Sequence, residues 1–177
     1  GAMSDPYNPF EASLQLTRHA LELIDAYRCG AAIATKSDLI VRDGDILDSI
    51  ARHSPVICKL TITTTDDALA ARLEPGAPSP SRRLAALREL ADRGLFAGVL
   101  LMPVLPFLED TEENVLEVVE RAAEAGESFV YPALGVTMRE GQREYFLQGL
   151  EDAFPGQGLR ARYLRRYGDR YWCASPR

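Results

Sequence analysis

The chain has 177 residues, of which 46% are hydrophobic and 26% are charged, and its formal net charge is −6. This length and composition are typical of one soluble domain with a substantial core. The acidic balance argues against tight, sequence-independent binding to a phosphate backbone, although it leaves room for a local basic groove.

Short apolar runs alternate with amphipathic segments along the chain. The apolar runs predict strands at 31–35, 56–63, 97–104 and 129–136, with the composition of strands that are covered on both faces. The amphipathic segments predict helices at 9–27, 43–53, 79–94, 110–126, 141–154 and 158–168. Strand followed by helix, four times over, indicates an α/β fold with a parallel sheet and right-handed crossovers.

Two parallel architectures fit this alternation, an open part of a (β/α) barrel and a doubly wound sheet. No glycine-rich dinucleotide fingerprint follows any strand, which favours a partial TIM-like barrel. Residues 1–4 look like the end of a strand whose beginning is not in the chain, although Gly1 and Ala2 before Met3 also fit the remnant of a tag. We therefore expect one domain over 1–177, truncated on its amino-terminal side, with about four βα units and a helical tail from about residue 139.

Polar residues follow the predicted strands at their carboxyl ends, where parallel α/β folds place their functional groups. Ser4 and Asp5 follow the strand-like start, and Lys36 follows the next strand. Thr61 and Thr63 are two residues apart, so strand geometry places them on one sheet face together with Lys59. A lysine and two threonines are costly to bury against helices, so this face is expected to line a polar pocket.

The cysteines and histidines suggest no metal site. Cys29, Cys58 and Cys173 are odd in number and far apart, without metal-ligand spacing or a disulfide framework. His19 and His53 lie in helix-like segments and are expected at the surface. No apolar run reaches membrane-spanning length and no secretory signal opens the chain, so we expect a reduced, cytoplasmic protein without a membrane partner.

Five segments in order resemble the radical SAM proteins related to spore photoproduct lyase, often labelled DNA repair photolyase-like. They are GAMSDPYNPFE, ATKSDLIVRDGDIL, KLTITTTDD, the stretch from EPGAPSPSRR to LPFLEDTEEN, and GVTMREGQREYF. The resemblance covers almost the whole chain. It implies a partial (β/α)6 barrel and S-adenosylmethionine (SAM), cleaved reductively by a [4Fe–4S] cluster to give a 5′-deoxyadenosyl radical.

The same resemblance implies roles for individual residues. Ser4 corresponds to a serine that contacts SAM, and Lys36 corresponds to a lysine near the SAM carboxylate. Thr61 stands where the family has a serine, so a hydroxyl is kept. Asp5 and Thr63, together with Met102, match the family only by their position in the site.

One departure from the family is large, because the chain contains no CxxxCxxC motif. The cluster ligands would then lie before Gly1, and the chain would be the carboxyl-terminal part of a longer enzyme that is inactive alone. Two alternatives remain open. The first is a non-catalytic half-barrel that binds a nucleoside or SAM, and the second is a cluster-free lyase with a Schiff base on Lys36 or Lys59.

The carboxyl-terminal tail has the composition of a nucleic-acid surface, which makes nucleic acid a possible partner. The interleaved residues are Arg160, Arg162, Tyr163, Arg165, Arg166, Tyr167, Tyr171 and Trp172. A solvated terminal helix whose aromatic residues pack on the barrel is the simpler explanation of the pattern. A partial barrel also exposes strand edges, so we expect a dimer or a missing segment to cover them.

Overall fold

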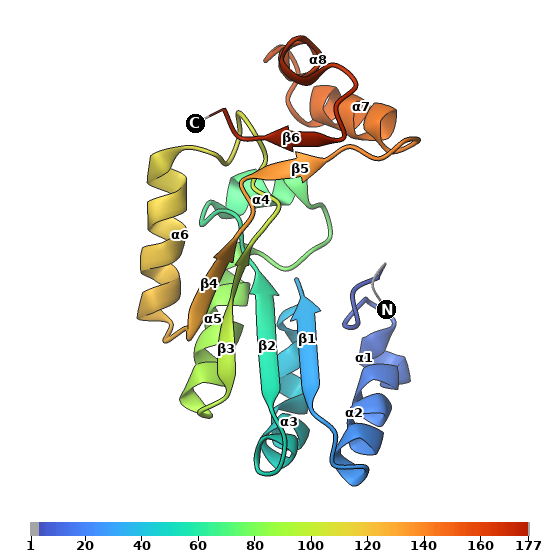
Figure 1. Ribbon diagram of the computed structural model, residues 1–177, viewed down its shortest axis with the longest axis vertical. Coiled ribbons are helices and arrows are strands. Elements are labelled where there is room, and N and C mark those ends of the chain that lie inside the picture. The colour runs from blue at the N-terminus through green and yellow to red at the C-terminus, as the bar shows by residue number, and fades with distance from the viewer. Residues whose placement is uncertain (1–3, 177) are drawn as a thin grey trace.

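The computed structural model describes residues 4–176, which form an α/β fold with a parallel sheet and a small antiparallel sheet (Figure 1). The parallel strands lie side by side in chain order as β1 (Ala31–Thr35), β2 (Val56–Thr61), β3 (Phe96–Leu101) and β4 (Phe129–Pro132). The predicted parallel sheet is therefore confirmed.

The helices occur where amphipathic periodicity predicted them, with two additions. They are α1 (Glu11–Leu14), α2 (Leu16–Ala26), α3 (Gly44–Ala51), α4 (Asp67–Leu73), α5 (Pro80–Asp92), α6 (Glu112–Glu124), α7 (Arg143–Ala153) and α8 (Leu159–Tyr167). The additions are α4 and a 3-10 helix, η1 (Asp38–Asp43). The Ser79 and Thr111 side chains cap α5 and α6, and the Asp66 carboxylate caps α4.

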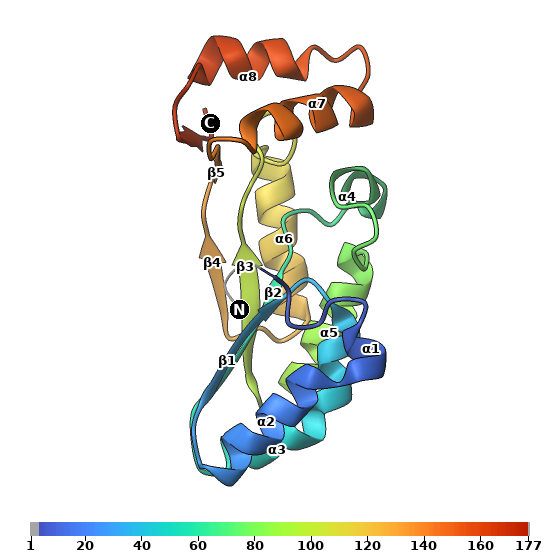
Figure 2. The ribbon, with the colours of Figure 1, turned by 90° about the vertical axis from the view of Figure 1, so that its right-hand side faces the viewer.

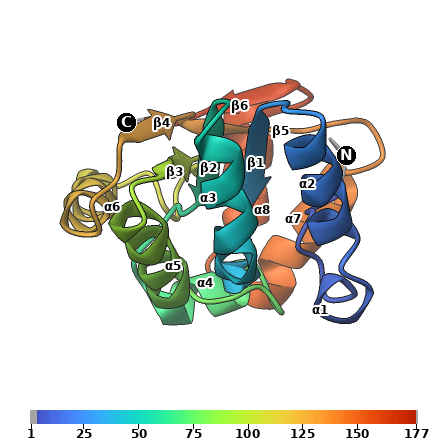
Figure 3. The same ribbon diagram turned by 90° about the horizontal axis from the view of Figure 1, so that it is seen from below.

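The helices between the parallel strands pack on one face of the sheet, as Figures 2 and 3 show. The main core lies between this face and the helices, and in β1 the buried residues alternate with exposed Ala32 and Ala34. The expectation of strands covered on both faces is wrong for the described part of the chain. The second face carries an open hollow of about 450 Å³. Phe96 and Tyr131 on it are 51% and 59% exposed, and the Phe96 and Phe129 rings stack at 5.2 Å.

The predicted helix at 9–27 is broken, and Glu11 accounts for the break. Gln15, between α1 and α2, has a left-handed backbone with φ of 52°. The Glu11 carboxylate accepts hydrogen bonds from the backbone amides of Thr17 (3.0 Å) and Arg18 (3.5 Å), which are free at the start of α2. A side chain of the first helix thus caps the second.

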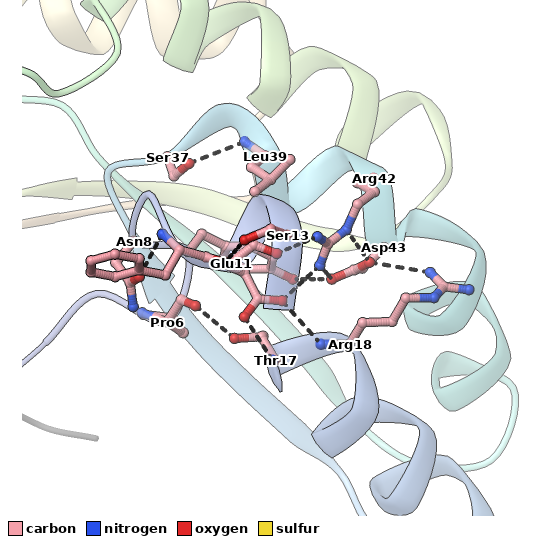
Figure 4. Close-up of polar contacts among 12 residues, drawn as sticks. Pro6, Asn8, Glu11, Ser13, Thr17, Arg18, Ser37, Leu39, Arg42 and Asp43 are labelled. Carbon is pink, nitrogen blue, oxygen red and sulfur yellow. Dashed lines mark hydrogen bonds and ion pairs between the residues drawn. The ribbon is translucent and has the colours of Figure 1, made fainter. Parts of the chain in front are cut away.

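A buried ion network fixes α1 and α2 to η1 (Figure 4). The Arg42 guanidinium lies between the Glu11 and Asp43 carboxylates, at 2.8 Å from each. Arg18 donates to Asp43 at 3.1 Å, and the Tyr7 hydroxyl donates to it at 3.1 Å. The network therefore holds the first turns of the described chain on the sheet assembly.

The tail forms its own layer beyond the carboxyl ends of the parallel strands (Figure 1). Here β5 (Gly135–Thr137) pairs antiparallel with β6 (Trp172–Ala174), and α7 and α8 enclose a second apolar cluster that α4 joins. The helices expected in the tail are confirmed, but the strand predicted at 129–136 is two strands in different sheets. Gly135 permits the change of direction, because its φ is 152° and an added Cβ would lie 2.6 Å from the Cys173 carbonyl oxygen.

Candidate functional site

The Asp5 carboxylate joins the first described residues to the carboxyl end of β1. One oxygen accepts from the Thr35 hydroxyl (2.6 Å) and from the Tyr7 amide (2.9 Å). The other accepts from the backbone amide of Lys36 at 2.8 Å. Asp5 thereby fixes the backbone from which the Lys36 side chain extends.

Lys36 belongs to a chain of charges that runs from the end of β1 to the end of β2. Its ammonium pairs with one Glu74 oxygen, and Arg83 donates to the other at 2.6 Å. Arg83 is 2% exposed and also donates to the Thr61 carbonyl at 2.9 Å. Burial alone would raise the pKa of Glu74, but the charges and hydrogen bonds of Lys36 and Arg83 hold it below its usual value. The Lys36 ammonium is therefore already paired with the Glu74 carboxylate.

Thr63 belongs to a separate buried cluster. Its hydroxyl donates to Glu109 at 2.6 Å, and Glu109 also accepts from the Leu105 amide at 2.9 Å. The Asn114 side chain donates to the carbonyls of Thr63 and Glu109. Burial raises the pKa of Glu109 above its usual value despite the hydrogen bonds from Thr63 and Leu105.

A cavity of about 390 Å³ lies beside Lys36. It is bounded by the loop after Asp5, by the start of η1 and by residues 76–78. Among the described residues that line this cavity, Lys36 carries the positive charge, and 39% of its side chain is exposed. The cavity can thus admit a small ligand whose anionic group competes with Glu74 for the ammonium.

The structure brings Asp5, Lys36 and Thr61 together, the last through Arg83. Ser4 is exposed in the loop before Asp5, and residues 1–3 lie outside the described part of the chain. The strand predicted at 56–63 ends at Thr61, so regular alternation does not extend to Thr63.

The remaining residues suggested for the site lie at different places in the structure. Lys59 and Met102 border the hollow on the open sheet face rather than the cavity beside Lys36. The expectation that His53 lies at the surface is wrong, because its side chain is 11% exposed and its Nε2 lies 2.7 Å from Asp25. His19 is exposed on α2. Neither histidine lines the cavity beside Lys36, so neither is positioned there as a base.

Sequence reasoning did not identify Glu74, Arg83, Glu109 or Asn114 as site residues. Glu74 and Arg83 lie within EPGAPSPSRR, which served only as a marker of the resemblance. Their partners are Lys36 and the Thr61 carbonyl, and a sequence pattern across a proline-rich loop does not reveal such pairings. The sequence shows Arg83 near the start of a predicted helix. It does not show that this arginine is buried, and burial is what distinguishes it from a surface residue.

The described residues do not fit an iron–sulfur cluster. Cys29 is exposed after α2, Cys58 is buried in β2, and Cys173 is buried in β6. Burial raises the pKa of the Cys58 thiol to about 12, which disfavours the thiolate that a metal needs. Within residues 4–176, no group of three His, Cys, Asp or Glu side chains is placed to hold a metal ion.

The tail packs part of its aromatic set and exposes the rest. Tyr163 and Tyr167 are buried in the second apolar cluster, whereas Tyr171 and Trp172 are exposed. Arg162 stacks on a core ring rather than extending freely, with its guanidinium carbon 4.3 Å from the Phe107 centroid. None of the helices in the described residues has the length and apolarity to cross a membrane.

Comparison with known proteins gives sequence relatives without assigned functions. An uncharacterized protein of Mycobacterium tuberculosis, Rv2578c, is 30% identical over 168 residues, which is 95% of this chain and 49% of the relative. MJ0683 of Methanocaldococcus jannaschii is 36% identical over 111 residues, 63% of this chain and 41% of the relative. The chain spans about half the length of the curated relatives it matches. No protein-family model matches it.

A solved structure of a spore photoproduct lyase point mutant has a similar fold. The TM-score is 0.52 at 17% sequence identity, over 82% of this chain and 55% of the lyase chain. At this identity the likeness concerns the fold alone. It supports the α/β architecture with a parallel sheet that the alternation of segments predicted.

Proposed function

We propose that this chain is part of a radical SAM enzyme, and that its parallel sheet is one part of a (β/α) barrel. The observation that carries the proposal is Lys36, whose ammonium stands beside a cavity at the carboxyl end of β1. The fold shared with a spore photoproduct lyase supports it. The open sheet face, with its exposed aromatic side chains, is what the interior of an incomplete barrel would present.

In this proposal Lys36 binds the SAM carboxylate, which replaces Glu74 at the ammonium. Arg83 remains with Glu74 and keeps its charge balanced. Asp5 is a positioning residue, because its carboxylate is already committed to the backbone and side chain at the end of β1. The hydroxyls of Ser4 and Thr61 do not line the cavity, so their contact with SAM is proposed from the resemblance alone, while Thr63 acts through Glu109.

The iron–sulfur cluster of such an enzyme needs ligands from outside the described residues, because the cysteines within them are dispersed. The chain alone would then bind SAM without cleaving it. Lyase or DNA-repair chemistry, a nucleic-acid substrate and a cytoplasmic location belong to the same proposal for the whole protein. A second copy or a further segment would cover the open sheet face.

Isothermal titration with SAM tests the assignment of Lys36. We expect Lys36→Ala to weaken SAM binding about tenfold or more, since a charged hydrogen bond contributes about 1.5–3 kcal/mol. Lys59→Ala is the matched control, because it removes a lysine of the open sheet face and should leave binding unchanged. Equal affinities of Lys36→Ala and the unaltered chain would refute the assignment.

A second candidate function follows from the dispersed cysteines. A half-barrel that binds SAM or a nucleoside without redox chemistry needs no cluster. Anaerobic reconstitution with iron and sulfide distinguishes the two for a protein of the relatives' full length. Cluster uptake together with Lys36-dependent SAM binding supports the enzyme, and SAM binding without any cluster supports the binding module.

A further inference from the structure

A second and larger cavity, of about 640 Å³, lies between α4 and α7. Figure 2 shows α7 above α4, with the segment after α4 running down toward α5. This volume is within the range of sites that bind small molecules, about 300–1,000 Å³. The cavity lies apart from the Lys36 pocket, although its wall residues Leu73 and Pro75 flank Glu74.

The cavity wall is mainly apolar and partly aromatic. The apolar wall is formed by Leu73, Leu105, Met138, Phe146, Leu150 and Phe154, and Tyr145 adds a ring that is 85% exposed. Such a wall favours a ligand with a ring or a branched hydrocarbon body, because burying that body removes apolar surface from water.

One cation at this cavity is held in place without a counter-charge. Arg72 donates from Nε (3.1 Å) and Nη2 (2.5 Å) to the Ala153 carbonyl, and its guanidinium carbon lies 4.0 Å from the Phe154 ring centroid. No carboxylate of the described residues lies within 4 Å of its nitrogens, whereas Arg18, Arg42 and Arg83 are all paired with carboxylates. Two hydrogen bonds and a stacked ring fix this guanidinium, so little side-chain freedom is lost when it binds an anion.

A glycine keeps part of the cavity open. Gly149 lies within α7, where glycine is among the poorest helix formers, and it lines the cavity. Nothing lies within 4 Å of the position that its Cβ would occupy. A side chain at 149 therefore fits sterically and would take up space that a ligand could use.

We propose that this cavity binds an amphipathic small molecule that has an apolar ring body and one anionic group. The body packs against the wall between α4 and α7, and the anionic group accepts hydrogen bonds from Arg72. Asp152 also lines the cavity, with its carboxylate held by Gln148 at 2.9 Å, and it disfavours ligands that carry more negative charge. The cavity binds such a molecule whether or not Lys36 binds SAM.

Two fluorescent probes with similar ring systems test the proposal on the full chain. They are 1-anilinonaphthalene-8-sulfonate, which carries one sulfonate, and N-phenyl-1-naphthylamine, which carries no charge. We expect Gly149→Leu to weaken both probes about tenfold or more by filling the cavity. We expect Arg72→Gln to weaken the sulfonate probe about tenfold and to leave the neutral probe unchanged.

Three further variants distinguish binding in this cavity from binding elsewhere on the protein. Asp152→Asn should strengthen binding of the sulfonate probe. Arg72→Lys should bind this probe more tightly than Arg72→Gln does, because lysine keeps the positive charge. Tyr131→Ser alters the open sheet face and should leave both affinities unchanged. The assignment to this cavity would be overturned if Gly149→Leu bound both probes normally, or if Tyr131→Ser abolished their binding. Equal losses of both probes in Arg72→Gln would overturn the anionic class of ligand. Circular dichroism of each variant checks that it is folded.

Discussion

Asp43→Asn is expected to destabilise the protein strongly, because Asp43 is the fully buried acceptor of the network in Figure 4. Its carboxylate accepts from Arg42 at 2.8 Å twice, from Arg18 at 3.1 Å and from the Tyr7 hydroxyl at 3.1 Å. Removing one partner of a buried ion pair costs about 3–5 kcal/mol. Asparagine keeps the shape and one acceptor oxygen, so we expect a loss of about 3 kcal/mol, the lower end.

Asp45→Asn is the matched control, since Asp45 also binds Arg18 but lies at the surface. Its side chain is 63% exposed, and exposed ion pairs contribute about 0–1 kcal/mol. Urea unfolding followed by circular dichroism measures both variants. With a slope of about 1–3 kcal/mol per molar, Asp43→Asn should lower the midpoint by about 1–3 M. Equal midpoints for the two variants would refute the reasoning from burial.

The pH dependence gives a further check on Asp43. Burial alone would raise its pKa, but hydrogen bonds from Arg42 and Arg18 outweigh burial and hold the pKa below its usual value. An aspartate in the unfolded chain titrates near pH ~3.9, so the stability due to Asp43 is complete above this pH. It is lost as the pH falls through the lower native pKa. The stability difference between the unaltered chain and Asp43→Asn should therefore shrink below about pH 4.

Two further predictions concern close packing and thiol access. Gly98→Ala should lower stability by about 1–3 kcal/mol, because its Cβ would lie 2.4 Å from the Phe129 carbonyl oxygen, whereas Gly149→Ala should raise it by about 0.5–1 kcal/mol. Thermal unfolding measures both, and a stable Gly98→Ala variant would show that β3 and β4 are not so close. Exposed Cys29 should react rapidly with a thiol reagent at pH 8, while Cys58 and Cys173 should react only after unfolding, since burial raises both of their pKa values. Rapid reaction of Cys58 would contradict its position between sheet and helices.

The sequence predicts the parallel sheet well because each strand is a short run of apolar residues between amphipathic segments. It fails where a distant partner decides the local structure. Glu11 caps α2 from six residues away, and this contact splits a segment whose periodicity predicts one helix. The separation of β5 from β4 likewise depends on pairing with β6, which follows it by more than thirty residues.

The candidate site was predictable as a location but not as a set of contacts. Carboxyl ends of parallel strands placed Asp5 and Lys36 together, and the structure has them joined through a backbone hydrogen bond. The partner of the Lys36 ammonium is Glu74, 38 residues away, beyond η1, α3, β2 and α4. Propensity and periodicity describe neighbours along the chain, so they contain no information about such a pair.

The hydrogen bonds of Asp5 also make the candidate site sensitive to mechanical force. A pull on the chain at its first described residues would act on β1 through one carboxylate, which holds the Thr35 hydroxyl and the Lys36 amide at once. A displacement of Asp5 would therefore move the acceptor of the Lys36 amide directly, whereas Tyr7 is held separately by Asp43. The position of the Lys36 backbone thus depends on the placement of a residue 31 positions earlier in the chain.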